Sequence, residues 1–217
     1  MTLTPESIAT LDKLRIWPEQ FHWYIIPLFA FVVYIYAVEI ERKNWNKVFA
    51  GLAFWGMDWI NEIINGVILH VTDYSALWTV SGDSGYVILV GLNIEISLMF
   101  AMAGIGFAKL LPGQKDLKIL GINNRILFAI GNSIFCVLVE VILNQAGALL
   151  WAYDFWNTTY FGLGLIPIVI FGYLTFMLVS FWVHDMEEIK NKILVTGFLY
   201  LLVIVLLVVF IPVFEWI

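Results

Sequence analysis

The sequence predicts an all-α, polytopic membrane protein, in which a bundle of six transmembrane helices follows a short amphipathic interfacial helix. The 217 residues are 62% hydrophobic and only 13% charged, and their mean hydropathy is +0.91, well above the range of soluble domains. The apolar residues form six runs, each near the roughly 20 residues that a helix needs to cross the hydrocarbon core. The polar breaks between these runs are short, and no repeat or low-complexity linker separates domains.

Residues 1–22 form the predicted interfacial segment. Thr4 is a suitable N-cap, followed by proline at the first helical position. Ile8, Leu11 and Leu14 recur on one side of this helix, opposite charged residues. Such a pattern is typical of a helix that lies at the membrane surface.

Residues 23–217 form the predicted transmembrane domain. The Ala- and Gly-rich third span is expected to pack closely and to be central, because small residues let helices approach one another. The one cysteine, Cys136, lies in an apolar run, so no disulfide framework is expected. The six predicted spans are residues 23–40, 48–71, 86–110, 125–151, 161–183 and 193–215.

The basic residues predict an orientation. Lys and Arg occur in the first, third and fifth loops, whereas the second and fourth loops, residues 72–85 and 152–160, contain none. Because cytoplasmic loops carry an excess of basic residues, we expect both termini on the non-cytoplasmic side of a bacterial or archaeal cytoplasmic membrane. The net charge of −6 argues against nucleic acid as a partner, and membrane lipids are the expected surroundings.

A polar stripe inside the second span is the main functional signal. Asp58, Glu62 and Asn65 stand at positions i, i+4 and i+7, so they share one helix face. A charged side chain at the membrane centre costs about 3 kcal/mol on insertion scales. Carboxylates placed there therefore predict a functional site.

More polar residues are predicted at overlapping depths in the next two spans. Asn93 and Glu95 belong to the outer half of the third span, and Glu140 and Asn144 share one face of the fourth. Consecutive spans with short loops usually pack as neighbours, so we expect one shared pocket that opens outward or into lipid. Crowding and burial favour the protonated form of such carboxylates, which can then donate a proton.

Aromatic residues are the second feature. Trp55 and Trp59 are predicted at depth near the acids, where ring faces could stabilise a ligand that becomes cationic or could simply fill the bundle. Trp78 and Trp156 are expected in the interfacial belts.

Metal or cofactor binding is not expected. His22, His70 and His184 fall at the membrane edges on this topology, and the sequence contains no metal-binding or phosphate-loop motif.

The segments Trp59-Ile60-Asn61-Glu62 and Gly91-Leu92-Asn93 resemble, in kind and order, a pattern of the small integral membrane terpene cyclases of meroterpenoid and indole-terpenoid pathways. The resemblance covers the second to fourth spans. It implies an enzyme that protonates a polyprenyl epoxide or olefin with a membrane carboxyl group, after which the cation cascades into rings. That family usually has seven spans and a second functional acid near the last one, where this chain offers only Asp185 and Glu215.

Three kinds of function remain open. The first is acid catalysis on a lipid-soluble, isoprenoid-like substrate, with Glu62 as proton donor. The second is proton- or cation-coupled transport by the same carboxylates. The third is a subunit of a homo-oligomer or larger membrane complex. The predicted site residues are Glu62, Asp58, Glu140 and Glu95 in the catalytic role, and Asn65, Asn93, Asn144, Trp59 and Trp55 in substrate binding.

Overall fold

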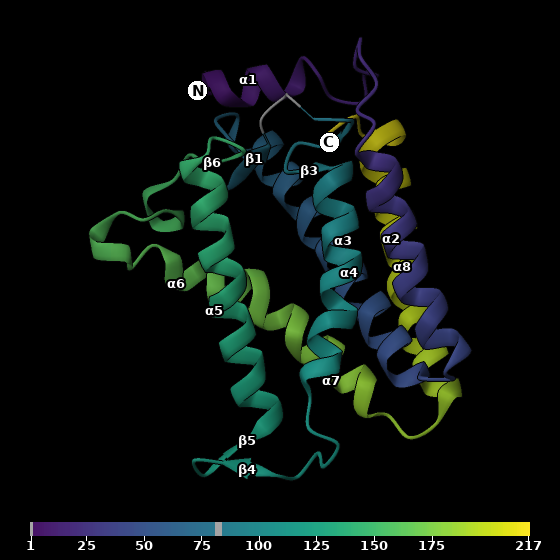
Figure 1. The fold of residues 1–217 in the computed structure, drawn as a ribbon. Helices are drawn as coiled ribbons and strands as arrows, with labels where there is room; N and C mark the ends of the chain where they lie inside the picture. Colours follow the sequence, from purple (N-terminus) through teal and green to yellow (C-terminus); the bar gives the residue numbers. More distant parts are fainter. Residues whose placement is uncertain (1, 81–83) are drawn as a thin grey trace.

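The computed structural model of this protein describes residues 2–80 and 84–217, and long helices dominate it (Figure 1). The helices are α1 (Pro5–Leu11), α2 (Ile25–Glu41), α3 (Trp45–Thr72), α4 (Ile94–Leu110), α5 (Asn124–Gln145), α6 (Leu165–Pro167), the π-helix η3 (Ile168–Leu174), α7 (Thr175–Asp185), α8 (Ile189–Val208) and the π-helix η4 (Val209–Val213). Short 3-10 turns, η1 (Asp154–Trp156) and η2 (Tyr160–Gly162), precede α6.

Three two-stranded antiparallel ribbons accompany the helices, so the described part of the chain is not purely α-helical. The ribbons pair β1 (Trp78–Val80) with β6 (Leu149–Trp151), β2 (Val87–Leu89) with β3 (Leu92–Asn93), and β4 (Lys118–Ile119) with β5 (Ile122–Asn123).

Two ribbons shorten helices that the sequence predicts to be longer. The predicted third span starts at residue 86, but α4 starts at Ile94, because β2 and β3 form a hairpin immediately before it. The predicted fourth span reaches residue 151, but α5 ends at Gln145. Gly147 follows in the left-handed conformation (φ 72°), which commonly ends a helix, and the next apolar residues pair with β1 instead.

Three helical segments of the described chain are long and apolar enough to cross a membrane: α5, the continuous segment 165–185 and the segment 189–213. Length and hydropathy do not support the predicted count of six. Helices α2 and α4 have 17 residues each, and the 28-residue α3 carries the polar stripe. In Figure 1 the segment from α6 to α7 crosses the molecule obliquely.

Helix α1 lies across one end of the long helices (Figure 1). Thr4 caps it as predicted, accepting a hydrogen bond from the backbone N–H of Ser7. Its polar side is the buried one: Ser7 Oγ is 3.0 Å from Ser75 Oγ, and Thr10 Oγ1 donates to the backbone oxygen of Val80 at 2.9 Å. The helix is therefore docked onto the loops at this end of the protein.

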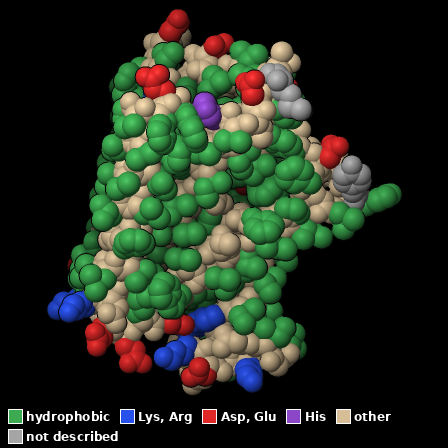
Figure 2. Space-filling model, turned by 180° about the vertical axis from the view of Figure 1, so that it is seen from behind, with side chains coloured by type: hydrophobic (Ala, Val, Ile, Leu, Met, Phe, Trp, Pro, Cys, Tyr) green, Lys and Arg blue, Asp and Glu red, His purple; other side chains and the backbone are tan. Residues whose placement is uncertain are grey.

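The two ends of the molecule differ in charge. Both chain ends lie at the end covered by α1 (Figure 1). On the face seen in Figure 2, Lys and Arg gather at the opposite end, while the middle is covered by hydrophobic side chains. This distribution matches a protein whose middle lies in the membrane.

The sequence predicted that the third span, which corresponds to α4, would be central. In the structure the central helix is α3. It packs against α4, α7 and α8. The closest approach is to α4, where a Cβ added at Gly104 would lie 2.8 Å from the backbone oxygen of Gly51. Backbone atoms cannot yield to such a contact as a flexible side chain can.

Gly104→Ala should therefore lower stability by about 1–3 kcal/mol, the usual range for overpacking. Thermal unfolding in detergent measures the change. Gly106→Ala is the matched control on the same helix, because a Cβ there meets nothing within 4 Å and alanine is the better helix former by about 1 kcal/mol. Equal destabilisation by both substitutions would contradict the close α3–α4 contact.

Candidate functional site

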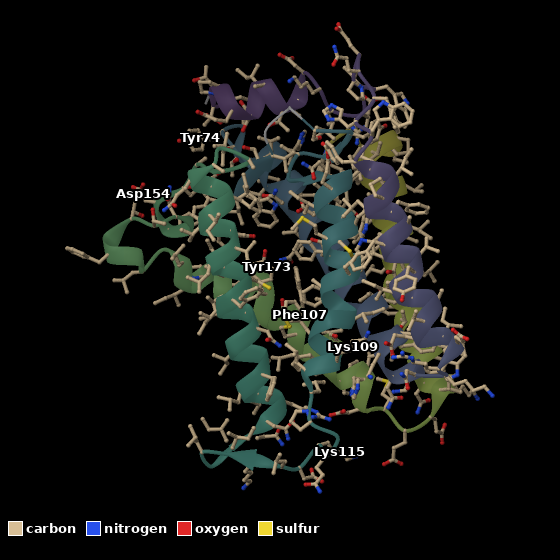
Figure 3. All side chains as sticks on the ribbon, in the orientation of Figure 1. Tyr74, Phe107, Lys109, Lys115, Asp154 and Tyr173 are labelled. Atoms are coloured by element: carbon tan, nitrogen blue, oxygen red, sulfur yellow. The ribbon has the colours of Figure 1, made fainter. Side chains whose placement is uncertain are left out.

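A cavity of about 320 Å³ lies inside the helix bundle. Its walls come from α3, α4, α5, η3 and α7, together with residues of β1 and β6 and the turn at Trp156. In Figure 3, Tyr173 and Phe107, two of the lining residues, lie between α5 and α4 at middle height. Most of the lining is apolar, and the polar exceptions include three carboxylates.

The three carboxylates are Asp58 and Glu62 from α3 and Glu140 from α5. The side chains of Asp58 and Glu62 are almost completely buried, with 2% and 3% of their surface exposed. The structure thus brings together three of the four predicted acids. Their four-residue spacing on α3 directs the first two to the same wall.

The Glu62 carboxylate is held from outside its own helix. The indole Nε1 of Trp78, in β1, donates to Glu62 Oε1 at 2.9 Å. The other oxygen, Oε2, is buried and has no hydrogen-bond partner among the residues that the structure describes. One oxygen is therefore fixed, and the other is an unpartnered acceptor enclosed beside Gly91, which a molecule in the cavity would reach only if the wall shifts.

Asn65 fixes the strand that carries Trp78. Its Nδ2 donates to the Trp78 backbone oxygen at 2.8 Å, and its Oδ1 accepts from the Leu77 N–H at 2.8 Å. Gly91 closes over this arrangement, since a Cβ at Gly91 would lie 2.5 Å from Glu62 Oε2 and would also collide with Asn65 and Trp78. Only glycine leaves room for the hydrogen-bonded cluster.

Glu140 is held in the same way by the π-helix. Tyr173 Oη donates to Glu140 Oε1 at 2.6 Å, and Tyr173 belongs to η3, which starts immediately after Pro167. Single π-helical turns often occur at functional sites. Here the irregular turn carries the donor for one of the three acids.

Asp58 lacks such a donor for one of its oxygens. Its Oδ2 is buried and unpartnered within residues 2–80 and 84–217. A buried polar atom without a partner is costly, so this oxygen is a second point where a bound molecule could form a hydrogen bond.

Aromatic rings cover much of the remaining wall. Phe100 is stacked on Tyr173 with centroids 6.0 Å apart, and Phe176 and Phe54 meet edge to face at 5.7 Å. Trp78 stacks on Trp156 at 5.6 Å. The sequence assigned both tryptophans to the interfacial belt, but strand β1 brings Trp78 and the turn η1 brings Trp156 to the cavity.

The predicted residues Asn93 and Glu95 lie outside the cavity lining. Asn93 caps α4, with its Oδ1 accepting from the Ile96 N–H at 2.9 Å. Glu95 Oε1 accepts from Tyr24 Oη and from the Gly85 N–H, both at 2.6 Å. These residues join the loop before α4 to the bundle.

The other four predicted binding residues also lie outside the lining, including Asn65, which instead holds β1. Asn144 donates to the Leu149 backbone oxygen at 2.9 Å, which ties the end of α5 to β6. Trp55 Nε1 donates to Ser97 Oγ at 3.0 Å. Trp59 packs with a separate apolar cluster that includes Val203.

Tyr173, Trp78 and Trp156 are the site residues that sequence reasoning missed. The two tryptophans lie near predicted span ends, where an aromatic residue is typical of a membrane interface. Tyr173 lies in the middle of the predicted fifth span, where no local pattern shows which way a ring faces. Within the described residues, no group of three or more His, Cys, Asp or Glu side chains is arranged to hold a metal ion.

The chain belongs to a family described as an uncharacterized membrane protein family, whose model matches residues 4–212. A relative from Archaeoglobus fulgidus, described as an uncharacterized protein, is 50% identical over 200 residues, which cover 91% of this chain and 92% of the relative. No solved structure matches the chain. These comparisons support membrane association and assign no activity.

Asn65→Leu should lower stability by about 1–3 kcal/mol, because the buried backbone groups at residues 77 and 78 lose their partner. Unfolding in detergent by heat or by denaturant measures the loss. Asn132→Leu is the matched control in α5: its buried Nδ2 has no partner among the described residues, so the substitution should be neutral or stabilising. A smaller loss at Asn65 than at Asn132 would contradict the role given to Asn65.

Proposed function

We propose that this protein is an intramembrane enzyme that uses buried carboxyl groups for acid catalysis on a lipid-soluble, isoprenoid-like substrate. One observation carries the proposal: three carboxylates share an apolar, aromatic-lined cavity of about 320 Å³. That volume is at the lower end of the range for small-molecule sites. A few polar groups converging in an apolar cavity are what such sites usually contain.

Entry from the bilayer is consistent with the cavity walls. Met99 of α4 and Phe135 of α5 both line the cavity, and their side chains are 42% and 57% exposed. The cavity therefore reaches the surface between these two helices. The exposed surface on this side of α5 is apolar, as at Ile134 and Leu138, so a hydrocarbon molecule could enter without meeting water.

The proposed chemistry is proton transfer followed by carbon–carbon bond formation. The Glu62 carboxyl group gives its proton to an alkene carbon or an epoxide oxygen and becomes a carboxylate. The resulting carbocation accepts the π electrons of a second alkene, which forms a new bond and moves the positive charge. Loss of a proton to a neighbouring carboxylate ends the sequence, and transfer of that proton to Glu62 restores the acid for the next turnover, so no oxidant or reductant is needed.

The residues of this chain fit these steps. Trp78 holds one Glu62 oxygen, which leaves the other without a partner in the cavity wall. Asp58 and Glu140 are the candidates to accept the final proton, since both line the same cavity. The rings of Phe54, Phe100 and their neighbours offer π faces to a passing cation.

Burial of the acids argues against a purely structural subunit. Polar residues that pack against another chain should be exposed on the outside of the bundle, whereas Asp58 and Glu62 are buried inside this bundle.

Coupled proton or cation transport is the second candidate function, and the π-helix beside Glu140 favours it. Broken helices are frequent at transporter sites.

We further propose that α2, α3 and α4 also cross the membrane, giving six spans with both termini outside. Placement of both chain ends together (Figure 1) and the gathering of Lys and Arg at the other end (Figure 2) support this orientation. The short α2 and α4 would need only slight thinning of the bilayer.

Cysteine labelling in intact cells tests this orientation. In a Cys136→Ala background, a cysteine replacing the exposed Thr158 should react with a membrane-impermeant maleimide, whereas one replacing the exposed Lys118 should react only after permeabilisation. The reverse pattern would overturn the orientation, and equal reactivity in intact cells would contradict the proposal that α5 spans the membrane once between these loops.

Glu62→Gln should abolish turnover while leaving unfolding temperature nearly unchanged, because glutamine keeps the volume but carries no acidic proton. Protein in nanodiscs is incubated in D2O with geranylgeraniol or its terminal epoxide. Mass spectrometry then detects a cyclised product. The product from geranylgeraniol carries deuterium on carbon, whereas the product from the epoxide, which is protonated on oxygen, is identified by its cyclisation alone.

Glu41→Gln, which removes an exposed carboxylate at the end of α2, is the matched control and should keep full activity. Deuterated product at the wild-type rate in Glu62→Gln would contradict the proposed proton donor. No product from either probe with the wild-type protein would contradict the proposed substrate class.

A further inference from the structure

A second pocket of about 320 Å³ lies at the opposite end of the protein from α1. It forms where the connection from α2 to α3 meets the connection from α7 to α8. Its lining is polar and basic, unlike that of the mostly apolar cavity that contains the three carboxylates. The lining residues are Lys43, Asn44, Trp45, Asn46, Lys47, His184, Glu187, Ile189 and Lys192.

Lys192 places a fixed positive charge in this wall. Its side chain is only 1% exposed, and Nζ donates to the backbone oxygens of Val183 at 2.8 Å and His184 at 2.7 Å. Lys43 lines the pocket from the other side. Among the described residues, neither lysine forms an ion pair with a carboxylate.

The carboxylates beside the pocket already form ion pairs, one of them with a lysine of the lining. Glu187, the carboxylate in the lining, is 88% exposed at its side chain and pairs with Lys115 at 3.6 Å. The buried Glu39 pairs with Lys109 at 2.6 Å and is 3.9 Å from Lys47 Nζ. Among the described residues, Lys43 and Lys192 are therefore the lining lysines without a carboxylate partner, whereas Lys47 shares Glu39 with Lys109.

Two long helices also begin at the pocket. Trp45 and Ile189 are the first residues of α3 and α8, and both line it. Free N–H groups and the helix dipole add positive potential at such ends. This contribution has the same sign as that of the lysines.

We propose that this pocket binds a phosphate group, supplied either by an anionic lipid headgroup or by free phosphate. Basic pockets between helices at the cytoplasmic membrane surface suit lipid headgroups, and Trp45 at the edge is 37% exposed, as an interfacial tryptophan would be. The neighbouring Lys and Arg side chains lie at this same end (Figure 2). The inference does not depend on the proposed catalysis.

Binding is measured on the full-length protein with two probes. Native mass spectrometry counts phosphatidylglycerol retained after exchange from vesicles of phosphatidylglycerol and phosphatidylcholine. Titration with sodium phosphate, against sodium chloride at equal ionic strength, measures any saturable rise in the unfolding temperature. Lys43→Gln/Lys47→Gln is the test variant.

Lys118→Gln/Lys190→Gln is the matched control, because it removes the same charge from two exposed lysines at the same end that neither line the pocket nor pair with its carboxylate. We expect the test variant to weaken binding at least tenfold and the control to change it less than twofold. Binding of phosphatidylglycerol without phosphate assigns the site to a headgroup, whereas binding of both assigns it to the phosphate group alone. Equal losses in the two variants, or no saturable binding of either probe by the wild-type protein, would overturn the proposal.

Discussion

The hydrogen bond from the Trp78 indole to Glu62 is the interaction on which the cavity depends. A carboxyl group deep in a protein requires a donor or a proton, and α3 alone cannot supply the donor. The chain meets this need by folding β1 back over α3, where Asn65 holds the strand by its backbone. The ribbon of β1 and β6 therefore has a structural role, because it places Trp78 in the cavity wall beside Glu62.

The same solution recurs on the other side of the cavity. Glu140 takes its donor from Tyr173, which a π-helical turn brings into the wall. In both cases an acid on a regular helix pairs with an aromatic donor on an irregular segment. The aromatic groups thus hold the acids in place and also supply the apolar surface of the cavity. Asp58 is left with an unpartnered oxygen inside this enclosure.

Helical periodicity was sufficient to predict part of the site. Asp58 and Glu62 share a face because they are four residues apart, and overlapping depth correctly suggested that Glu140 would meet them. Glu95 has a similar depth, but the hairpin before α4 directs it to Tyr24 and Gly85. Strands of two or three residues leave no periodic signal, so the hairpin of β2 and β3 could not be predicted. The inward turn of Trp78 depends on pairing with the distant β6, which the sequence does not show either.

The central claim is that the cavity lined by Asp58, Glu62 and Glu140 binds a lipid-soluble molecule. Native mass spectrometry of protein extracted from its membrane into nanodiscs tests this claim most directly. The wild-type protein should retain one apolar, non-phospholipid molecule, and Ala103→Phe should lose it, because Ala103 lines the cavity. Gly106→Phe, which points into open space on the same helix, should retain it. Equal retention in both variants, or only phospholipid on the wild-type protein, would contradict the account.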